Sequence, residues 1–279
     1  MASVFDGYAP RRGFLVCVDS DGCAMDAMDI KHTRCFGPCL VAEWGLDPWR
    51  EEVLGRWNEI NLYTMTRGVN RFQGLLTVLR EIDGAQRPIE GVDELAYWVR
   101  TTPELSDRAL EQAVAAGGGV CLQKALHWSR QVNAAIAALP EAAKQPFSGV
   151  GQALAAAHQA ADVAVVSSAN RDAVEAEWAG HGLADHVDLI LAQDAGPKAR
   201  CIAALLRQGY DPARVLMVGD APGDLAATEK NGVWFYPILV RREAESWARF
   251  PEALNALTTG RCPETAPVWR EEFRRNLGG

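Results

Sequence analysis

The sequence predicts an α/β fold in which a doubly wound parallel sheet carries an inserted all-helical domain. Three observations lead to this prediction. Short apolar runs are typical of buried strands, helical patterns alternate with them, and one long stretch holds almost no strand signal.

The strand pattern is an apolar run rich in strand-forming residues that stops at a polar turn. Residues 14–18 end at Asp19, and residues 163–166 and 215–218 end in the same way at Ser167 and Gly219. Strand and helix alternation of this kind is typical of parallel sheets. The other segments of the alternation are the helical patterns 172–180 and 199–208 and the apolar runs 188–192 and 233–240.

The stretch 25–148 separates two core strands by far more residues than a crossover needs, so it is predicted to be a helical domain inserted into a core of residues 1–24 and 149–279. Residues 140–151, rich in Pro and Gly, are expected to be the return linker, and the tail beyond 241 is expected to be helical. The predicted helices of the insertion are 48–60, 71–82, 92–100, 105–116 and 120–139.

Composition and charge exclude several classes of protein. The chain has 279 residues and a net charge of −8, without a basic stripe, which disfavours nucleic acid as a partner. No apolar stretch is long enough for a membrane span. Seven cysteines, an odd number, do not form a disulfide framework in a chain of this size, so we expect a reducing cytoplasm.

Polar residues at the strand ends are the candidates for chemistry. Because ligands of such sheets bind beyond the carboxyl ends of the strands, Asp19, Ser167 and Asp220 are expected at one edge. A carboxylate held in line with phosphorus beside a divalent cation can form an acyl phosphate that water later cleaves. Taken singly, each acidic residue could equally be a turn or helix-cap residue.

Four motifs in order resemble those of the haloacid dehalogenase-like superfamily. They are Asp19-Ser20-Asp21-Gly22, then Ser167, then Lys198 after Gly-Pro, and finally Gly219-Asp220-Ala-Pro-Gly-Asp224. The resemblance covers residues 12–24 and 160–240, and the insertion after the first motif resembles the helical cap of the phosphatase branch.

The resemblance implies a role for each motif residue. Asp19 would be the nucleophile, Asp21 the general acid and base, and Lys198 a catalytic cation. Ser167, with its neighbour Ser168, would contact the phosphate. The implied Mg²⁺ ligands are the Asp19 carboxylate, the Asp21 carbonyl and Asp220, with Asp224 orienting a metal-bound water or Lys198.

An acid at position 21 favours phosphoester chemistry, because dehalogenation has no leaving oxygen to protonate. Cys23 departs from the small hydroxyl residue usual after the glycine, and we interpret it as a packing residue. The predicted function is therefore release of phosphate from a small phosphorylated metabolite by a Mg²⁺-dependent enzyme. A phosphomutase or phosphotransferase on the same site, or a binding protein without turnover, are the alternatives.

The insertion is expected to set substrate specificity. Lys31 and Arg71 are the candidates for contacts to the substrate, with the alternative that they are solvated helix residues. His32, Cys35 and Cys39 share one helical face, but buried packing is the favoured interpretation over a zinc site. The tryptophans of the insertion are expected first to form its core, with a stacking surface for substrate or a dimer interface as alternatives.

Overall fold

The computed structural model describes residue 5 and residues 7–278, and the chain separates into two compact units. We call them the core unit, Met1–Met28 with Glu141–Gly279, and the helical unit, Asp29–Pro140. This division falls inside the predicted limits of the insertion. The reason is a short antiparallel pair, β2 (Met25–Asp26) with β3 (Gln145–Pro146), which belongs to the core unit.

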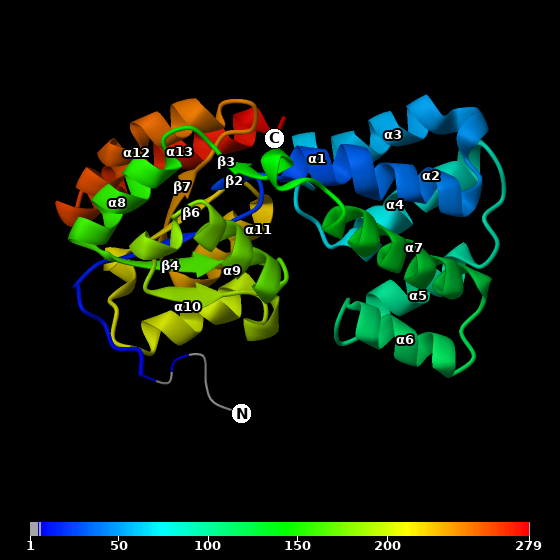
Figure 1. The fold of residues 1–279 in the computed structure, drawn as a ribbon, viewed down its shortest axis with the longest axis horizontal. Helices are drawn as coiled ribbons and strands as arrows, with labels where there is room; N and C mark the ends of the chain where they lie inside the picture. The colour runs from blue at the N-terminus through cyan, green and yellow to red at the C-terminus, as the bar shows by residue number, and fades with distance from the viewer. Residues whose placement is uncertain (1–4, 6, 279) are drawn as a thin grey trace. The chain divides into compact units, whose positions relative to one another are not determined.

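The core unit contains a five-stranded parallel sheet in the order β5–β4–β1–β6–β7 (Figure 1). Its central strand β1 pairs with β4 on one side and β6 on the other, so that Val16 lies opposite Val163 and Leu216. The predicted doubly wound sheet is confirmed. The strands are β1 (Leu15–Val18), β4 (Asp162–Val166), β5 (Leu189–Leu191), β6 (Val215–Gly219) and β7 (Trp234–Pro237).

Alternate residues of the strands pack on opposite faces of the sheet. Val16 and Val18 of β1 join one apolar cluster, and Leu15 and Cys17 join the other, because successive side chains of a strand point to opposite sides. The first face is covered by α8 (Val150–Ala160), α9 (Arg171–Gly180), α12 (Glu243–Thr258) and α13 (Cys262–Asn276), and the second by α10 (Lys198–Leu206) and α11 (Pro222–Asn231).

Helix α8 lies where the sequence pattern indicated the end of a linker. Its cap residue Gly149 has a φ of +91°, a left-handed conformation that favours glycine. The Gly residues at the end of 140–151 therefore mark the start of a helix.

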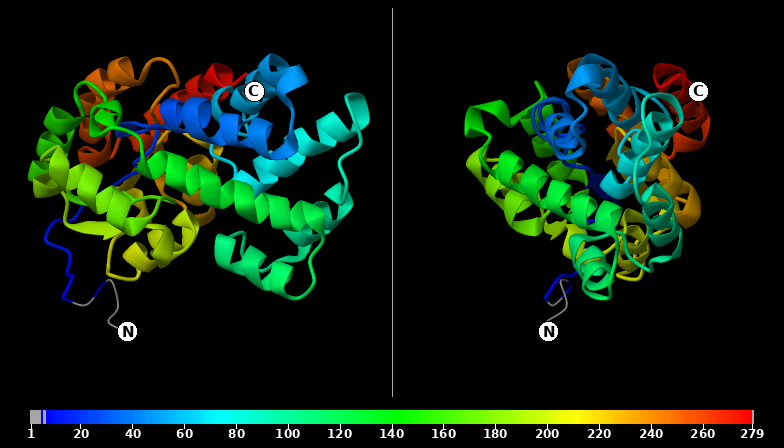
Figure 2. Two further views of the ribbon diagram at one scale, coloured as in Figure 1. Left: turned by 45° about the vertical axis from the view of Figure 1, so that its right-hand side comes forward. Right: turned by 90° about the vertical axis from the view of Figure 1, so that its right-hand side faces the viewer.

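The helical unit is built around aromatic side chains. Trp57, Trp128 and Phe72 are almost fully buried in it, and Trp44 and Trp98 are buried as well. Its longest helix, α7, packs against α2, α5 and α6 (Figure 2). Its α-helices are α1 (Met28–Lys31), α2 (Gly37–Trp44), α3 (Arg50–Asn58), α4 (Arg71–Ala85), α5 (Val92–Thr101), α6 (Asp107–Ala115) and α7 (Val120–Ala137).

Two five-residue segments of the helical unit are wound as π-helices. They are η1 (His32–Phe36), between α1 and α2, and η3 (Glu59–Tyr63), directly after α3. The sequence pattern did not predict them, since no residue preference separates a π-turn from an α-turn. π-Turns are rare and occur often at functional sites.

Within residue 5 and residues 7–278, no helix combines the length and the apolar character that a membrane span requires.

Asp162, at the start of β4, ties the segment that precedes β1 to the sheet. Its Oδ2 accepts hydrogen bonds from the backbone N–H groups of Arg11 at 2.9 Å and Arg12 at 3.0 Å, and from the Tyr210 hydroxyl at 2.6 Å. The residue is only 2% exposed. Three donors therefore converge on one buried carboxylate oxygen and hold the segment before β1 and Tyr210 at the start of β4.

Replacing Asp162 with Ala would leave these donors without their acceptor. We expect the free energy of unfolding to fall by about 2–4 kcal/mol, as for other broken buried networks. Urea unfolding followed by circular dichroism measures it. The exposed Asp185→Ala variant is the control, and a loss no larger than that of the control would contradict the anchoring role.

Candidate active site

The polypeptide turns sharply as it leaves β1. The Asp19 N–H donates to the Val218 carbonyl at 3.0 Å, which continues the pairing of β1 with β6 for one more residue. Beyond it, the N–H groups of Ala24 and Met25 donate to the Ser20 carbonyl, and Gly22 takes a φ of +78°. The turn fixes the Asp19 side chain at the carboxyl end of the central strand.

Two buried tryptophans brace this turn from the helices. Trp178 of α9 donates its indole N–H to the Ser20 hydroxyl at 2.9 Å, and Trp247 of α12 donates to the Cys23 carbonyl at 2.8 Å. Sequence reasoning missed both as positioning residues. Their only signal was their place among the apolar positions of a helix, which predicts burial but not a partner.

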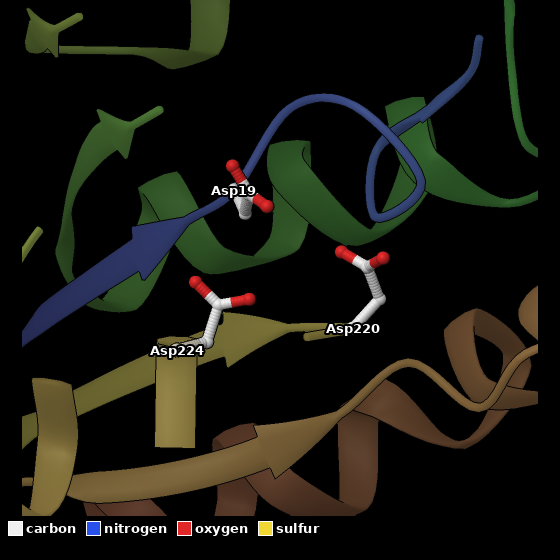
Figure 3. Close-up of side chains that lie close together, drawn as sticks. All are labelled: Asp19, Asp220 and Asp224. Carbon is white, nitrogen blue, oxygen red and sulfur yellow. The ribbon is translucent and has the colours of Figure 1, made fainter. Parts of the chain in front are cut away.

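Three carboxylates meet at the edge of the sheet. Asp19 follows β1, Asp220 follows β6 and Asp224 lies in the first turn of α11, and their side chains point toward a common space (Figure 3). One oxygen from each lies within 4.8 Å of the others. Their exposed fractions are 6%, 1% and 0%, so the negative charges are almost completely removed from water.

Lys198, the first residue of α10, supplies a positive charge to this cluster. Its Nζ lies 2.7 Å from Asp19 Oδ2 and donates to Asp224 Oδ1 at 2.6 Å. A buried lysine is costly unless it is paired, and here one ammonium pairs with two carboxylates.

The charges of the cluster shift one another's protonation. Burial raises the pKa of Asp19, and the neighbouring Asp224 and Asp220 raise it further, against the opposing effect of Lys198. Burial alone would lower the pKa of Lys198, but the charges of Asp19 and Asp224 outweigh it, so that the pKa is raised. The carboxylates thus outnumber the cation that holds them together.

This donor set fits Mg²⁺. Hard carboxylate oxygens are the ligands this ion prefers, and a divalent cation would offset the excess of negative charge among Asp19, Asp220 and Asp224. Both oxygens of Asp224 also serve the protein, since Oδ2 accepts from the Ala221 N–H at 3.1 Å and Oδ1 accepts from Lys198 at 2.6 Å.

Gly219, the last residue of β6, leaves room for Asp224. A Cβ at this position would lie 2.4–2.5 Å from three atoms of the Asp224 carboxyl side chain, closer than non-bonded atoms approach. A hydrogen atom at position 219 is therefore what permits Asp224 to reach Lys198. Sequence reasoning noted Gly219 only as part of a motif.

The other predicted residues of the core unit lie around the cluster. Ser167 is buried at the end of β4, where its hydroxyl accepts from the Ala169 N–H at 3.1 Å, whereas Ser168 is exposed. Asp21 is partly exposed and its backbone bridges to Met25. Cys23 is fully buried, with its thiol 3.5 Å from the Val218 carbonyl, in agreement with a packing role.

Lys31 and Arg71, the two predicted substrate contacts of the insertion, belong to the helical unit. Lys31 is 8% exposed, and Arg71 donates to Ser129 Oγ at 2.9 Å and to Asn133 Oδ1 at 2.7 Å. Among the described residues, the one group with the geometry of a metal site is the aspartate cluster of the core unit. His32, Cys35 and Cys39 do not belong to that group.

Comparison with known structures identifies similar folds at low sequence identity. A proposed phosphoglycolate phosphatase from Lactobacillus delbrueckii subsp. bulgaricus is 12% identical over 88% of this chain and 98% of its own, with a TM-score of 0.52. A proposed phosphoglycolate phosphatase from Haemophilus somnus is 13% identical over 81% and 86%, with a TM-score of 0.49. A haloacid dehalogenase-like family hydrolase from Xanthomonas campestris is 16% identical over 90% and 93%, with a TM-score of 0.48.

Sequence comparison identifies the family. No curated protein sequence matches the chain. The family model described as haloacid dehalogenase-like hydrolase matches residues 64–232, which is more than half of the chain and includes Ser167, Lys198, Asp220 and Asp224. The chain belongs to the haloacid dehalogenase-like hydrolases.

Proposed function

We propose that this hydrolase is a Mg²⁺-dependent phosphatase that releases phosphate from a small phosphorylated metabolite through a phosphorylated Asp19. The observation that carries the proposal is the buried cluster in which Lys198 bridges Asp19 and Asp224 beside Asp220. The solved protein from Lactobacillus delbrueckii subsp. bulgaricus, a proposed phosphoglycolate phosphatase, agrees with a phosphate ester as substrate.

Asp19 is the nucleophile in this proposal. Oδ1 of Asp19 accepts a hydrogen bond from the Ser20 N–H at 2.8 Å, and Oδ2 lies 2.7 Å from the Lys198 Nζ. These contacts hold the carboxylate in one orientation, as an in-line attack requires. Attack on phosphorus forms the acyl phosphate and breaks the bond to the leaving oxygen. Water then attacks phosphorus and regenerates the carboxylate.

Asp21 is the acid and base. It lies two residues beyond Asp19, on the tight turn that Gly22 permits, and it is less buried than the cluster. In the first step it gives a proton to the leaving oxygen, and in the second it takes one from the attacking water.

The remaining residues bind phosphate or organise charge. Lys198 stabilises the charge on the phosphoryl oxygens, and the Ser167 hydroxyl binds one of them, with Ser168 beside it. Mg²⁺, held by Asp19, Asp220 and the Asp21 carbonyl, would neutralise the phosphate dianion. Asp224 keeps Lys198 in place. Lys31 and Arg71 of the helical unit bind the rest of the substrate.

The Asp19→Asn variant removes the nucleophile at nearly constant size. We expect phosphate release from a panel of phosphate monoesters to fall at least about 1,000-fold, because the acyl phosphate cannot form. EDTA should also abolish turnover of the intact protein, and added Mg²⁺ should restore it. Exposed Asp172→Asn is the matched control, and isomer formation without free phosphate would instead identify a mutase.

The Asp21→Asn variant tests the general acid. We expect hydrolysis of an alkyl phosphate to fall by about 100-fold or more, whereas p-nitrophenyl phosphate, whose leaving group needs no proton, should lose much less. The comparison is made from kcat/KM for the two esters with one enzyme preparation. Equal losses for both esters would show that Asp21 does not protonate the leaving oxygen.

The Gly219→Ala variant tests the support of Lys198 by Asp224. The added methyl group would displace the Asp224 carboxyl, and we expect kcat to fall by about 100-fold, as for other misplacements of about 1 Å. Gly223→Ala is the matched control, since a Cβ there meets nothing within 4 Å. Equal kcat values for the two variants would exclude this role of Asp224.

A further inference from the structure

Ser20 connects Asp19 to the turn that follows it, and both of its backbone polar groups are hydrogen-bonded. Its N–H donates to Asp19 Oδ1 at 2.8 Å, and its carbonyl accepts from the N–H groups of Ala24 at 2.9 Å and Met25 at 2.8 Å. The residue is fully buried. One residue therefore both orients the Asp19 carboxylate and closes the turn.

The Ser20 hydroxyl ties this turn to helix α9. Trp178 Nε1, which can only donate, gives its hydrogen to Ser20 Oγ at 2.9 Å, so the direction of the hydrogen bond is fixed. The Trp178 ring is fully buried and belongs to the apolar cluster on one face of the sheet. Because both partners are buried, water does not compete for this hydrogen bond.

Ser20 and Trp178 are matched to each other, and we call them the Ser20–Trp178 pair. The backbone bonds of position 20 require only a residue with an N–H group, so the serine side chain is not needed for the turn itself. If position 20 were apolar, the buried indole N–H would lose its acceptor, and if position 178 were phenylalanine, the buried hydroxyl would lose its donor. Either loss is costly in a dry environment.

A second indole holds the other end of the turn. Trp247 of α12 donates to the Cys23 carbonyl at 2.8 Å, and the Cys23 N–H donates to the Ser20 carbonyl at 3.3 Å. This tie uses a backbone carbonyl, whereas the tie to α9 uses a side-chain hydroxyl. A substitution at position 20 can therefore remove the bond to α9 and leave the backbone of the turn intact.

We infer that Ser20 is a positioning residue, resting on the proposed phosphatase function: its hydrogen bond to Trp178 keeps the Ser20 N–H directed at Asp19 Oδ1 and so holds the nucleophile in line with phosphorus. Oδ2 faces Lys198 on the other side of the carboxylate. A rotated Ser20 peptide would release Oδ1, and the carboxylate could then turn about its Cβ–Cγ bond. A misplacement of about 1 Å is enough to slow such an attack by about 100-fold.

The Ser20→Ala variant removes the hydroxyl and retains the backbone bonds. We expect kcat for phosphate release to fall by about tenfold and KM to change by less than about twofold, because the groups that bind the substrate remain in place. Trp178→Phe should cause the same loss. The double variant should lose no more than either single variant, since all three lack the same hydrogen bond. Losses that multiply in the double variant would overturn the inference.

Trp234→Phe is the matched control. Trp234, the first residue of β7, donates its indole N–H to the Ala213 carbonyl at 2.9 Å, at the end of the sheet opposite to Asp19. This variant also loses one indole hydrogen bond in the core unit, and we expect its kcat to stay within about twofold of that of the intact protein. An equal fall of kcat in the control would show a general loss of stability and would also overturn the inference.

Amide hydrogen exchange tests the same pair without turnover. Ser20→Ala and Trp178→Phe should raise exchange in peptides covering residues 19–25 by at least about tenfold, and Trp234→Phe should not. Unchanged exchange in both variants would overturn the inference. Faster exchange in these variants, if the intact protein releases phosphate from no ester, would support the orientation of Asp19 by the pair and contradict the phosphatase. Phosphate release with unchanged exchange would do the reverse.

Discussion

The site depends on one interaction, the pairing of the buried Lys198 ammonium with both Asp19 and Asp224. Three carboxylates at the edge of a sheet would repel one another in a dry environment, and the cost of burying them is reduced only by a cation among them. The charged residues of the cluster come from separate strands and helices. β1 and β6 bring two of the aspartates, α11 brings the third, and α10 begins with the lysine.

The pairing of Lys198 with Asp19 and Asp224 also requires small residues and tight turns nearby. Gly219 has no side chain because Asp224 occupies the space, and Gly22 adopts a left-handed conformation so that the chain can turn away from Asp19. The two indole N–H groups of Trp178 and Trp247 then hold the turn. The geometry of the cluster thus depends both on the turn itself and on the packed helices α9 and α12 that contact it.

Much of the core and of the cluster was predictable from the sequence, since both depend on local patterns. The apolar runs that form β1, β4 and β6 and the polar residues that follow them place Asp19, Asp220 and Ser167 at one edge, because parallel strands share their carboxyl ends. The contacts between distant residues were not predictable. Nothing in the spacing shows that Trp178 reaches Ser20 or that a Cβ at position 219 would clash with Asp224. Helix α8 was not predicted, because the Gly residues at its start are also typical of a linker.

The position of β1 in the sheet has a consequence for the order of folding during synthesis. β1 is the central strand, yet its partners β4 and β6 begin only at Asp162 and Val215. The ribosome therefore completes the helical unit, Asp29–Pro140, before β1 can pair. Until then the apolar residues Leu15 to Val18 have no strand to pair with. The nascent chain therefore exposes an unpaired apolar segment while more than half of the protein is synthesised. During this interval the unpaired apolar segment is open to pairing with other chains, which favours aggregation.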